Sequence, residues 1–149
     1  MATKSFVPRG SNEGSIGTVA KPWLESRIRD AQAVRNMGRY TAGTTVSGQR
    51  VVVRGAAGVL YADSSNPAHA GAVLGVTNGA ALAGTEVDVV ERGAVDDAGW
   101  SWTPYQPLWL NGVGLISGTP PSSGFSCQIG FALTATRIYV AVQVPVVMI

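Results

Sequence analysis

Side chains that could perform chemistry are few in this chain, and they are scattered. His69 is the only histidine and Cys127 the only cysteine among the 149 residues. A catalytic nucleophile needs a base within hydrogen-bonding reach, and a third group must orient that base. His69 lies in the segment NPAHAG with only Asp63 as a nearby acid in the sequence, and zinc-ligand spacing is absent. His69 is therefore interpreted either as a base for one of several serines or, preferably, as a turn residue.

The carboxylates are equally open to two interpretations. Asp96 and Asp97 are adjacent in VDDAGW, and Glu86 and Asp88 are two residues apart. Two carboxylates can form a glycosidase pair or bind calcium, but Asp-Asp-Ala-Gly is also an ordinary turn sequence. No lysine follows Lys21, so no glycine-rich phosphate loop is present. We therefore predict a protein that is not an enzyme and that needs neither a metal ion nor a cofactor.

An aromatic group stands out in the segment WSWTPYQPLWL. It consists of Trp100, Trp102, Tyr105 and Trp109. Tryptophan rings stack on the apolar faces of sugars, so one hypothesis is a surface that binds a host glycan. Tryptophan and tyrosine are also enriched at subunit interfaces, so the other hypothesis is that the tryptophans fill one end of a barrel or are buried in a trimer interface. The prolines suit a packed loop, which favours the second hypothesis.

Charge divides the chain into two unequal parts. Residues 1–39 hold seven basic and three acidic residues, a net +4, whereas residues 40–149 hold four basic and six acidic residues, a net −2. Single-stranded nucleic acid requires a basic groove lined with aromatic rings, and Trp23 alone does not provide one. We expect the basic part either to dock on an acidic protein surface or to form a solvated helix face, with no nucleic acid as partner. The first residues do not resemble a signal peptide, and no apolar run is long enough to cross a membrane.

The same division appears in the expected secondary structure. In KPWLESRIRDAQAVRNMG, Leu24 and Ile28 fall at helical spacing, Pro22 suits a first turn and Gly38 a stop. This predicts one short helix over about residues 22–37 within an N-terminal anchoring arm, residues 1–39. The body is then predicted to comprise residues 40–149.

The body shows the two-residue periodicity of strands. Residues 51–53 predict a compact buried strand, and Val87 and Val89 are expected on the face opposite Glu86 and Asp88. A further strand is predicted to align four apolar residues on one face before Pro145 interrupts it: Ile138, Val140, Val142 and Val144. The fold class is therefore predicted as mainly β, a small antiparallel β-barrel or sandwich preceded by an extended N-terminal arm and one short helix.

Two stretches of the body resemble each other. Residues 58–76 and 114–131 each contain a glycine, two apolar residues, a loop rich in Ser and Pro, and a strand with an internal glycine. The similarity indicates either two equivalent groups of strands around one core or only the use of similar turn residues in both stretches. Cys127, in FSCQIG, is expected in a strand interior.

Two segments resemble proteins of tailed bacteriophages. The first is PRGSNEGSIGTVAKPW, with Pro8, Arg9, Glu13, Ile16 and Trp23 at the matching positions; it is similar to a segment near the start of fibre and head-fibre chains. The second runs from Trp100 to Val140 and resembles small β-domains of capsid decoration and fibre proteins. Together these segments touch roughly half of the chain, and neither carries catalytic residues.

This resemblance implies a virion structural protein assembled in the host cytoplasm. It implies a homotrimer that decorates the capsid, as a cement or head-fibre protein, and that contacts the major capsid protein. The alternative is a tail fibre or other appendage that contacts tail or neck proteins and binds a host glycan. In either case the arm would provide the anchoring contacts, through Phe6, Pro8, Arg9, Glu13, Ile16, Trp23, Leu24, Arg27, Ile28 and Arg35.

Overall fold

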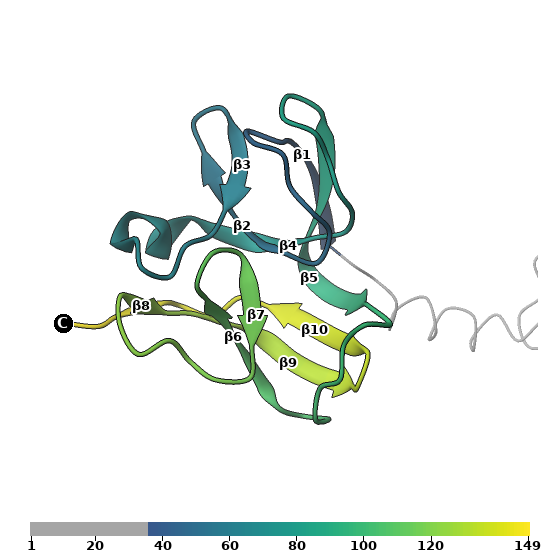
Figure 1. Ribbon diagram of the computed structural model, residues 1–149, viewed down its shortest axis with the longest axis vertical. Coiled ribbons are helices and arrows are strands. Elements are labelled where there is room, and N and C mark those ends of the chain that lie inside the picture. Colours follow the sequence, from purple (N-terminus) through teal and green to yellow (C-terminus); the bar gives the residue numbers. More distant parts are fainter. Residues whose placement is uncertain (1–35) are drawn as a thin grey trace, which may run out of the picture. The chain divides into compact units, whose positions relative to one another are not determined.

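The computed structural model describes residues 36–149 (Figure 1). This part of the chain contains eleven strands and one short 3-10 helix. The elements are β1 Asn36–Thr41, β2 Val51–Gly55, β3 Gly58–Tyr61, η1 Pro67–Ala72, β4 Val73–Thr77, β5 Glu86–Asp96, β6 Pro107–Asn111, β7 Leu115–Ser117, β8 Phe125–Ser126, β9 Gln128–Thr134, β10 Arg137–Ala141 and β11 Val146–Val147. The prediction of a mainly β chain is confirmed.

Nine of these strands form one antiparallel sheet. Its order is β3-β2-β4-β5-β10-β9-β6-β7, and β1 pairs with β5 beside this path. The remaining strands, β8 and β11, pair with each other. β3 and β7, at the two ends of the path, do not pair with each other, so these strands form an open path and not a closed barrel.

β5 joins the two halves of the body. Its first part pairs with β1 and β4, and its last part pairs with β10. Gly93 lies between these parts with φ of 123°, a conformation that side-chain-bearing residues rarely adopt. In Figure 1, β1–β4 lie in the upper half and β6, β7, β9 and β10 in the lower half, with β5 reaching both.

The buried apolar side chains form two clusters. The larger cluster includes Val51, Val53 and Val90 from the first half with Leu108 and Ile129 from the second. The smaller one lies entirely in the first half and comprises Ala42, Val46, Val52, Val59, Ala81, Val87 and Val89. Since successive side chains of a strand point to opposite faces, β2 contributes to both clusters. This explains why three consecutive valines are all buried.

The two halves repeat the same topology. The first has the order β3-β2-β4-β5 and the second β7-β6-β9-β10. In each half a hairpin is followed by a strand that pairs with the first hairpin strand, and then by a strand that pairs with this third one. The resemblance of residues 58–76 to residues 114–131 thus corresponds to a structural repeat, although the core is divided into two clusters.

Three details differ from the sequence-based expectations. Asn36–Arg39, assigned to the arm, lie in β1, so neither the predicted helix nor the arm extends through them. The exposed side of β1 carries Met37 as well as Arg39, and the strand character of β1 comes from pairing with β5, which no local pattern reveals. The last predicted strand ends at Ala141, four residues before Pro145, and Val144 is 88% exposed. The segment after Pro145 does form a separate strand, β11, as predicted.

Candidate functional site

The predicted anchoring residues of the arm lie outside the described part of the chain. These are Phe6, Pro8, Arg9, Glu13, Ile16, Trp23, Leu24, Arg27, Ile28 and Arg35. Their role as an anchor stays a prediction. The candidate sites described below all belong to residues 36–149.

His69 lies in the short 3-10 helix η1 and is half-buried, whereas the sequence favoured a turn. Its Nδ1 atom accepts a hydrogen bond from the backbone N–H of Asp63 at 3.0 Å. The carboxylate of Asp63 accepts bonds from both the hydroxyl and the backbone N–H of Ser65, and these bonds lower the pKa of Asp63. Ser65 therefore donates its hydrogen bonds to the carboxylate of Asp63 and not to the imidazole of His69, which is the arrangement of a structural turn and not of a catalytic pair.

The paired carboxylates separate into two structural roles. Asp96 forms an ion pair with Arg137 across β5 and β10, at 2.6 Å between Oδ1 and Nε. Asp97 accepts a hydrogen bond from the backbone N–H of Gly99 at 2.8 Å, which is the Asx turn expected for Asp-Asp-Ala-Gly. Within residues 36–149, no group of three or more His, Cys, Asp or Glu side chains could hold a metal ion.

The structure divides the aromatic group between different surroundings. Trp100 and Trp102 are neighbours, with ring centroids 6.1 Å apart, and both pack against the larger core cluster. The indole N–H of Trp102 is buried and has no hydrogen-bond partner among the described residues. Trp109 lies in β6 and lines a groove described below. The four residues thus do not form one continuous platform.

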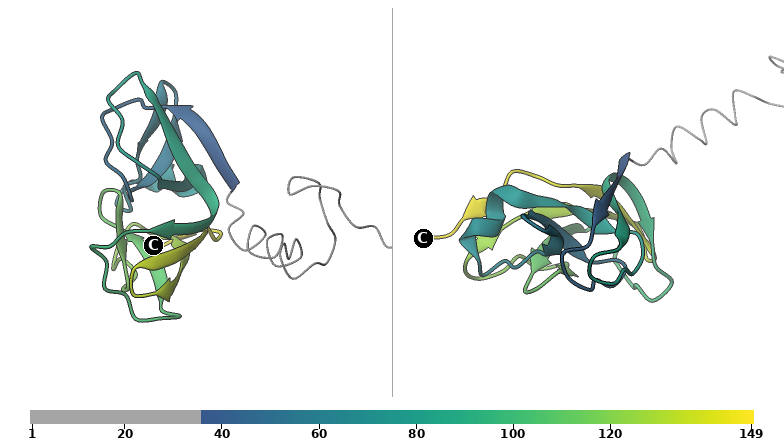
Figure 2. Two further views of the ribbon diagram at one scale, coloured as in Figure 1. Left: turned by 90° about the vertical axis from the view of Figure 1, so that its right-hand side faces the viewer. Right: turned by 90° about the horizontal axis from the view of Figure 1, so that it is seen from above.

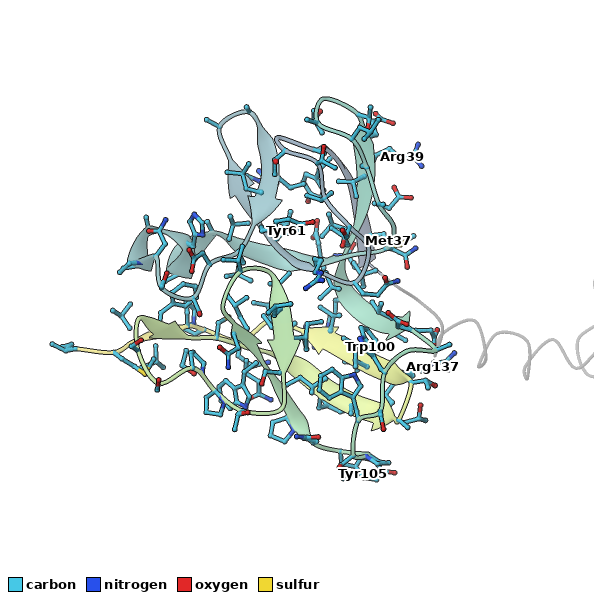
Figure 3. All side chains as sticks on the ribbon, viewed as in Figure 1. Met37, Arg39, Tyr61, Trp100, Tyr105 and Arg137 are labelled. Atoms are coloured by element: carbon cyan, nitrogen blue, oxygen red, sulfur yellow. The ribbon has the colours of Figure 1, made fainter. Side chains whose placement is uncertain are left out.

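Tyr105 is the exposed member of the aromatic group. Its side chain is 81% exposed, and its backbone adopts φ of 67°. A non-glycine residue in this region carries strain of about 1 kcal/mol or more. The backbone N–H of Tyr105 donates to the carbonyl of Ala132 at 2.7 Å, which fixes the loop. Figure 3 shows Tyr105 at the lower tip of the body, well separated from Trp100.

A groove of about 550 Å³ lies near the C-terminal strand β11. It is lined by side chains without charge, namely Trp109, Pro120, Pro121, Ser126, Gln128, Gln143, Val144, Val146 and Met148. Val144 and Val146 of this lining are exposed, and so are the neighbouring Val147 and Ile149. We call these four residues, with the groove, the C-terminal apolar surface. The right-hand view of Figure 2 shows β11 leading to the C-terminus at one end of the body.

A second, smaller pocket of about 210 Å³ lies between the two halves. It is lined by Gly48, Gln49, Arg50, Asp97, Trp100, Leu115 and Ile116. Sequence analysis singled out Trp100 and Asp97 but missed Gln49 and Arg50. The only local signal is the turn sequence SGQR, and nothing in it indicates that β7 and the loop after β5 lie nearby.

Cys127 is fully buried in the larger core cluster, and it lies between β8 and β9 and not in the strand interior that the sequence predicted. Burial raises the pKa of its thiol to about 11, because the thiolate would lose its hydration. A thiol with this pKa is a poor nucleophile at neutral pH.

Comparison with known proteins adds no family assignment. The chain matches no protein-family model and no curated protein sequence. Within residues 36–149, no helix is long and apolar enough to cross a membrane.

Proposed function

We propose that this chain is a non-enzymatic structural component of a tailed-phage virion. Its place in the particle would be that of a homotrimeric capsid decoration (cement) or head-fibre protein, held by its N-terminal arm. The proposal rests on the resemblance of the segments around Pro8–Trp23 and Trp100–Val140 to such proteins. It includes an arm with a short helix, and a body that packs its antiparallel strands as a sandwich.

The C-terminal apolar surface is the structural observation that supports the oligomer in this proposal. Exposed apolar patches of soluble proteins mark contact sites. Because no charged side chain lines the groove, a second copy can approach without charge repulsion and without leaving a charge buried and unpaired. β11 pairs only with β8 within the described chain, so its other edge is available to a neighbouring strand. We therefore propose that further copies of this chain cover the surface.

Oligomeric mass tests this contact directly. Light scattering coupled to size exclusion is expected to give three times the 15.4 kDa of the chain. Val144→Asp and Val146→Asp should lower this mass, because each places a charge in the apolar contact. Leu82→Asp is the matched control: Leu82 is 68% exposed but lies between β4 and β5, away from the C-terminal surface. A monomeric wild-type chain would contradict the proposed trimer.

The number of copies per particle distinguishes a capsid location from a tail location. In purified particles of the virus that encodes this chain, quantitative mass spectrometry should find a copy number comparable with that of the major capsid protein. Replacement of the arm anchors by Phe6→Ser and Trp23→Ser should reduce incorporation while leaving the oligomer intact. Absence of the wild-type chain from particles would refute the virion proposal.

A tail appendage or fibre component is the second candidate. Tyr105 favours it, because a strained backbone presents this aromatic ring almost completely to solvent. A few copies per particle, together with loss of attachment to host cells on Tyr105→Ala, would support this candidate. An unchanged attachment rate and a high copy number would exclude it.

A further inference from the structure

The small pocket of about 210 Å³ between the two halves has the composition of a ligand site. Three segments far apart in the sequence form it: residues 48–50 before β2, the loop after β5 with Asp97 and Trp100, and Leu115 and Ile116 of β7. We infer that this pocket binds a single neutral sugar ring of a glycan. The inference concerns ligand chemistry and holds for a capsid or a tail location alike.

Backbone hydrogen bonds hold the first wall of the pocket rigidly. The N–H groups of Gln49 and Arg50 donate to the carbonyl and hydroxyl oxygens of Thr77, at 2.9 and 3.0 Å. Thr77 is fully buried, and its hydroxyl donates in turn to the carbonyl of Ser47 at 2.7 Å. Gln49 has φ of 55°, a strained conformation that these bonds maintain. Strain of this kind is frequent at binding sites.

The opposite wall is fixed as well. The backbone N–H of Asp97 donates to the carbonyl of Thr136 at 2.9 Å, and the N–H of Trp100 donates to the carbonyl of Asp97 at 3.1 Å. β7 is joined to β2 by the bond from the N–H of Val51 to the carbonyl of Gly114, at 3.0 Å. The pocket therefore exists before a ligand arrives, which lowers the entropic cost of binding.

The polar side chains of the pocket retain capacity for hydrogen bonds. Among the described residues, no hydrogen bond or ion pair is formed by the side chains of Gln49 and Arg50. The carboxylate of Asp97 uses one oxygen for the N–H of Gly99, which leaves the other oxygen available. Gln49 and Arg50, which carry donors, and Asp97, which carries an acceptor, thus line one small space. Trp100 belongs to the same lining.

These groups select the class of ligand. An anion such as phosphate would be attracted by Arg50 but repelled by Asp97, and a metal ion would find a single carboxylate. Hydroxyl groups both donate and accept, so a sugar can satisfy all three polar side chains. The volume is below the roughly 300–1,000 Å³ of pockets for drug-sized ligands, which fits one ring and not an oligosaccharide.

Titration of the full chain with methyl glycosides of glucose, galactose, mannose and N-acetylglucosamine tests the inference. Amide and indole N–H resonances in two-dimensional NMR spectra are the readout. At least one glycoside should shift the signals of Gln49, Arg50 and the Trp100 indole in a saturable manner. No saturable shift with any of the four probes would overturn the inference.

Matched variants locate the binding. Asp97→Asn keeps an oxygen for the Gly99 N–H, so the turn should survive, and Arg50→Gln removes only a side chain without partners. Each should weaken binding at least tenfold. Arg92→Gln and Tyr105→Ala, which lie outside the pocket lining, should leave the affinity unchanged. If Arg50→Gln and Asp97→Asn bind as the wild type does, the pocket is not the site.

Titration with anionic probes tests the class of ligand. Inorganic phosphate and methyl glucuronide are added under the same conditions. Binding of these probes alone, strengthened by Asp97→Asn, would refute a neutral-sugar site. Neither outcome affects the copy number or mass of the particle-bound oligomer, so this inference and the virion proposal fail independently.

Discussion

Two glycines occupy positions where a neighbouring strand leaves no room for a side chain. A Cβ atom on Gly75 in β4 would overlap the backbone carbonyl of Val90 in β5. A Cβ atom on Gly130 in β9 would overlap the carbonyl of Tyr139 in β10. β4 and β9 have corresponding places in the two halves, so both copies of the repeat use a glycine for the same close approach.

Alanine substitution measures this close approach. Gly75→Ala and Gly130→Ala should each lower the free energy of unfolding by about 2 kcal/mol or more, because backbone atoms must move to admit a methyl group. Gly71→Ala in η1 is the control, since a Cβ atom there meets nothing within 4 Å. Urea denaturation gives the three values, and equal values for all three variants would contradict the argument.

The raised pKa of Cys127 predicts a loss of stability at alkaline pH. The thiol stays neutral in the folded protein up to about pH 11, whereas an unfolded thiol ionises near its usual pKa of 9.0. Below pH 9 both states are protonated, so the group adds no pH dependence. Between about pH 9 and 11 only the unfolded state releases its proton, and unfolding becomes easier.

A comparison with Cys127→Ala separates the stability loss caused by this thiol from that caused by other groups that titrate at alkaline pH. Urea midpoints measured from pH 8 to pH 11 should decline more steeply for the wild type than for the variant. A thiol reagent should also fail to label the native protein at pH 8 and succeed after unfolding. Parallel pH profiles with rapid native labelling would show that the thiol is accessible.

At the scale of the element, β2 is buried on both of its faces. Val51 and Val52 are both fully buried but belong to different core clusters. Most antiparallel strands have one face in solvent and alternate apolar with polar residues. β2 therefore has three consecutive valines because it lies between two layers of packed side chains.

Single alanine substitutions test this position. Val51→Ala and Val52→Ala should each destabilise the protein by about 2 kcal/mol, from two lost methyl groups at about 0.8 kcal/mol each and an added cavity cost. Leu82→Ala, at a site that is 68% exposed, should change stability by less than about 0.5 kcal/mol. If one of the two β2 variants were neutral, that face of the strand would have to be open to solvent.

At the scale of the whole molecule, the two halves share β5 and the larger core cluster. Neither half has all of its strand pairings without β5, because the first part of β5 pairs with β4 and the last part pairs with β10. We therefore expect the body to unfold as one cooperative unit.

Fluorescence and circular dichroism together test this cooperativity. Trp100, Trp102 and Trp109 all follow β5, so in a Trp23→Phe background tryptophan fluorescence reports on the second half and on the larger cluster, against which Trp100 and Trp102 pack. Val52→Ala removes methyl groups from the smaller cluster, in the first half. It should nevertheless shift the fluorescence midpoint and the circular dichroism midpoint equally. A shift in circular dichroism alone would show that the halves unfold separately.

The sequence by itself was sufficient for the features that depend on local pattern. It indicated the mainly β class, the buried strand at residues 51–53, the faces of Val87 and Val89, and a separate strand after Pro145. It also indicated the turn role of Asp97. Side-chain alternation, proline and turn residues act over a few neighbouring positions, so these features can be derived without knowledge of strand partners.

Only the tertiary structure decided which distant segments meet. The first four residues of β1, 36–39, were assigned to the arm because the pairing of β1 with β5 spans about fifty residues and leaves no periodic trace in β1 itself. The aromatic group, adjacent in sequence, is divided between the core, a groove and an exposed loop. The pocket unites residues 48–50 with Asp97, Trp100 and β7. Such long-range contacts are selected by the fit of whole strands and their buried faces, a property of the assembled sheet and not of any short segment.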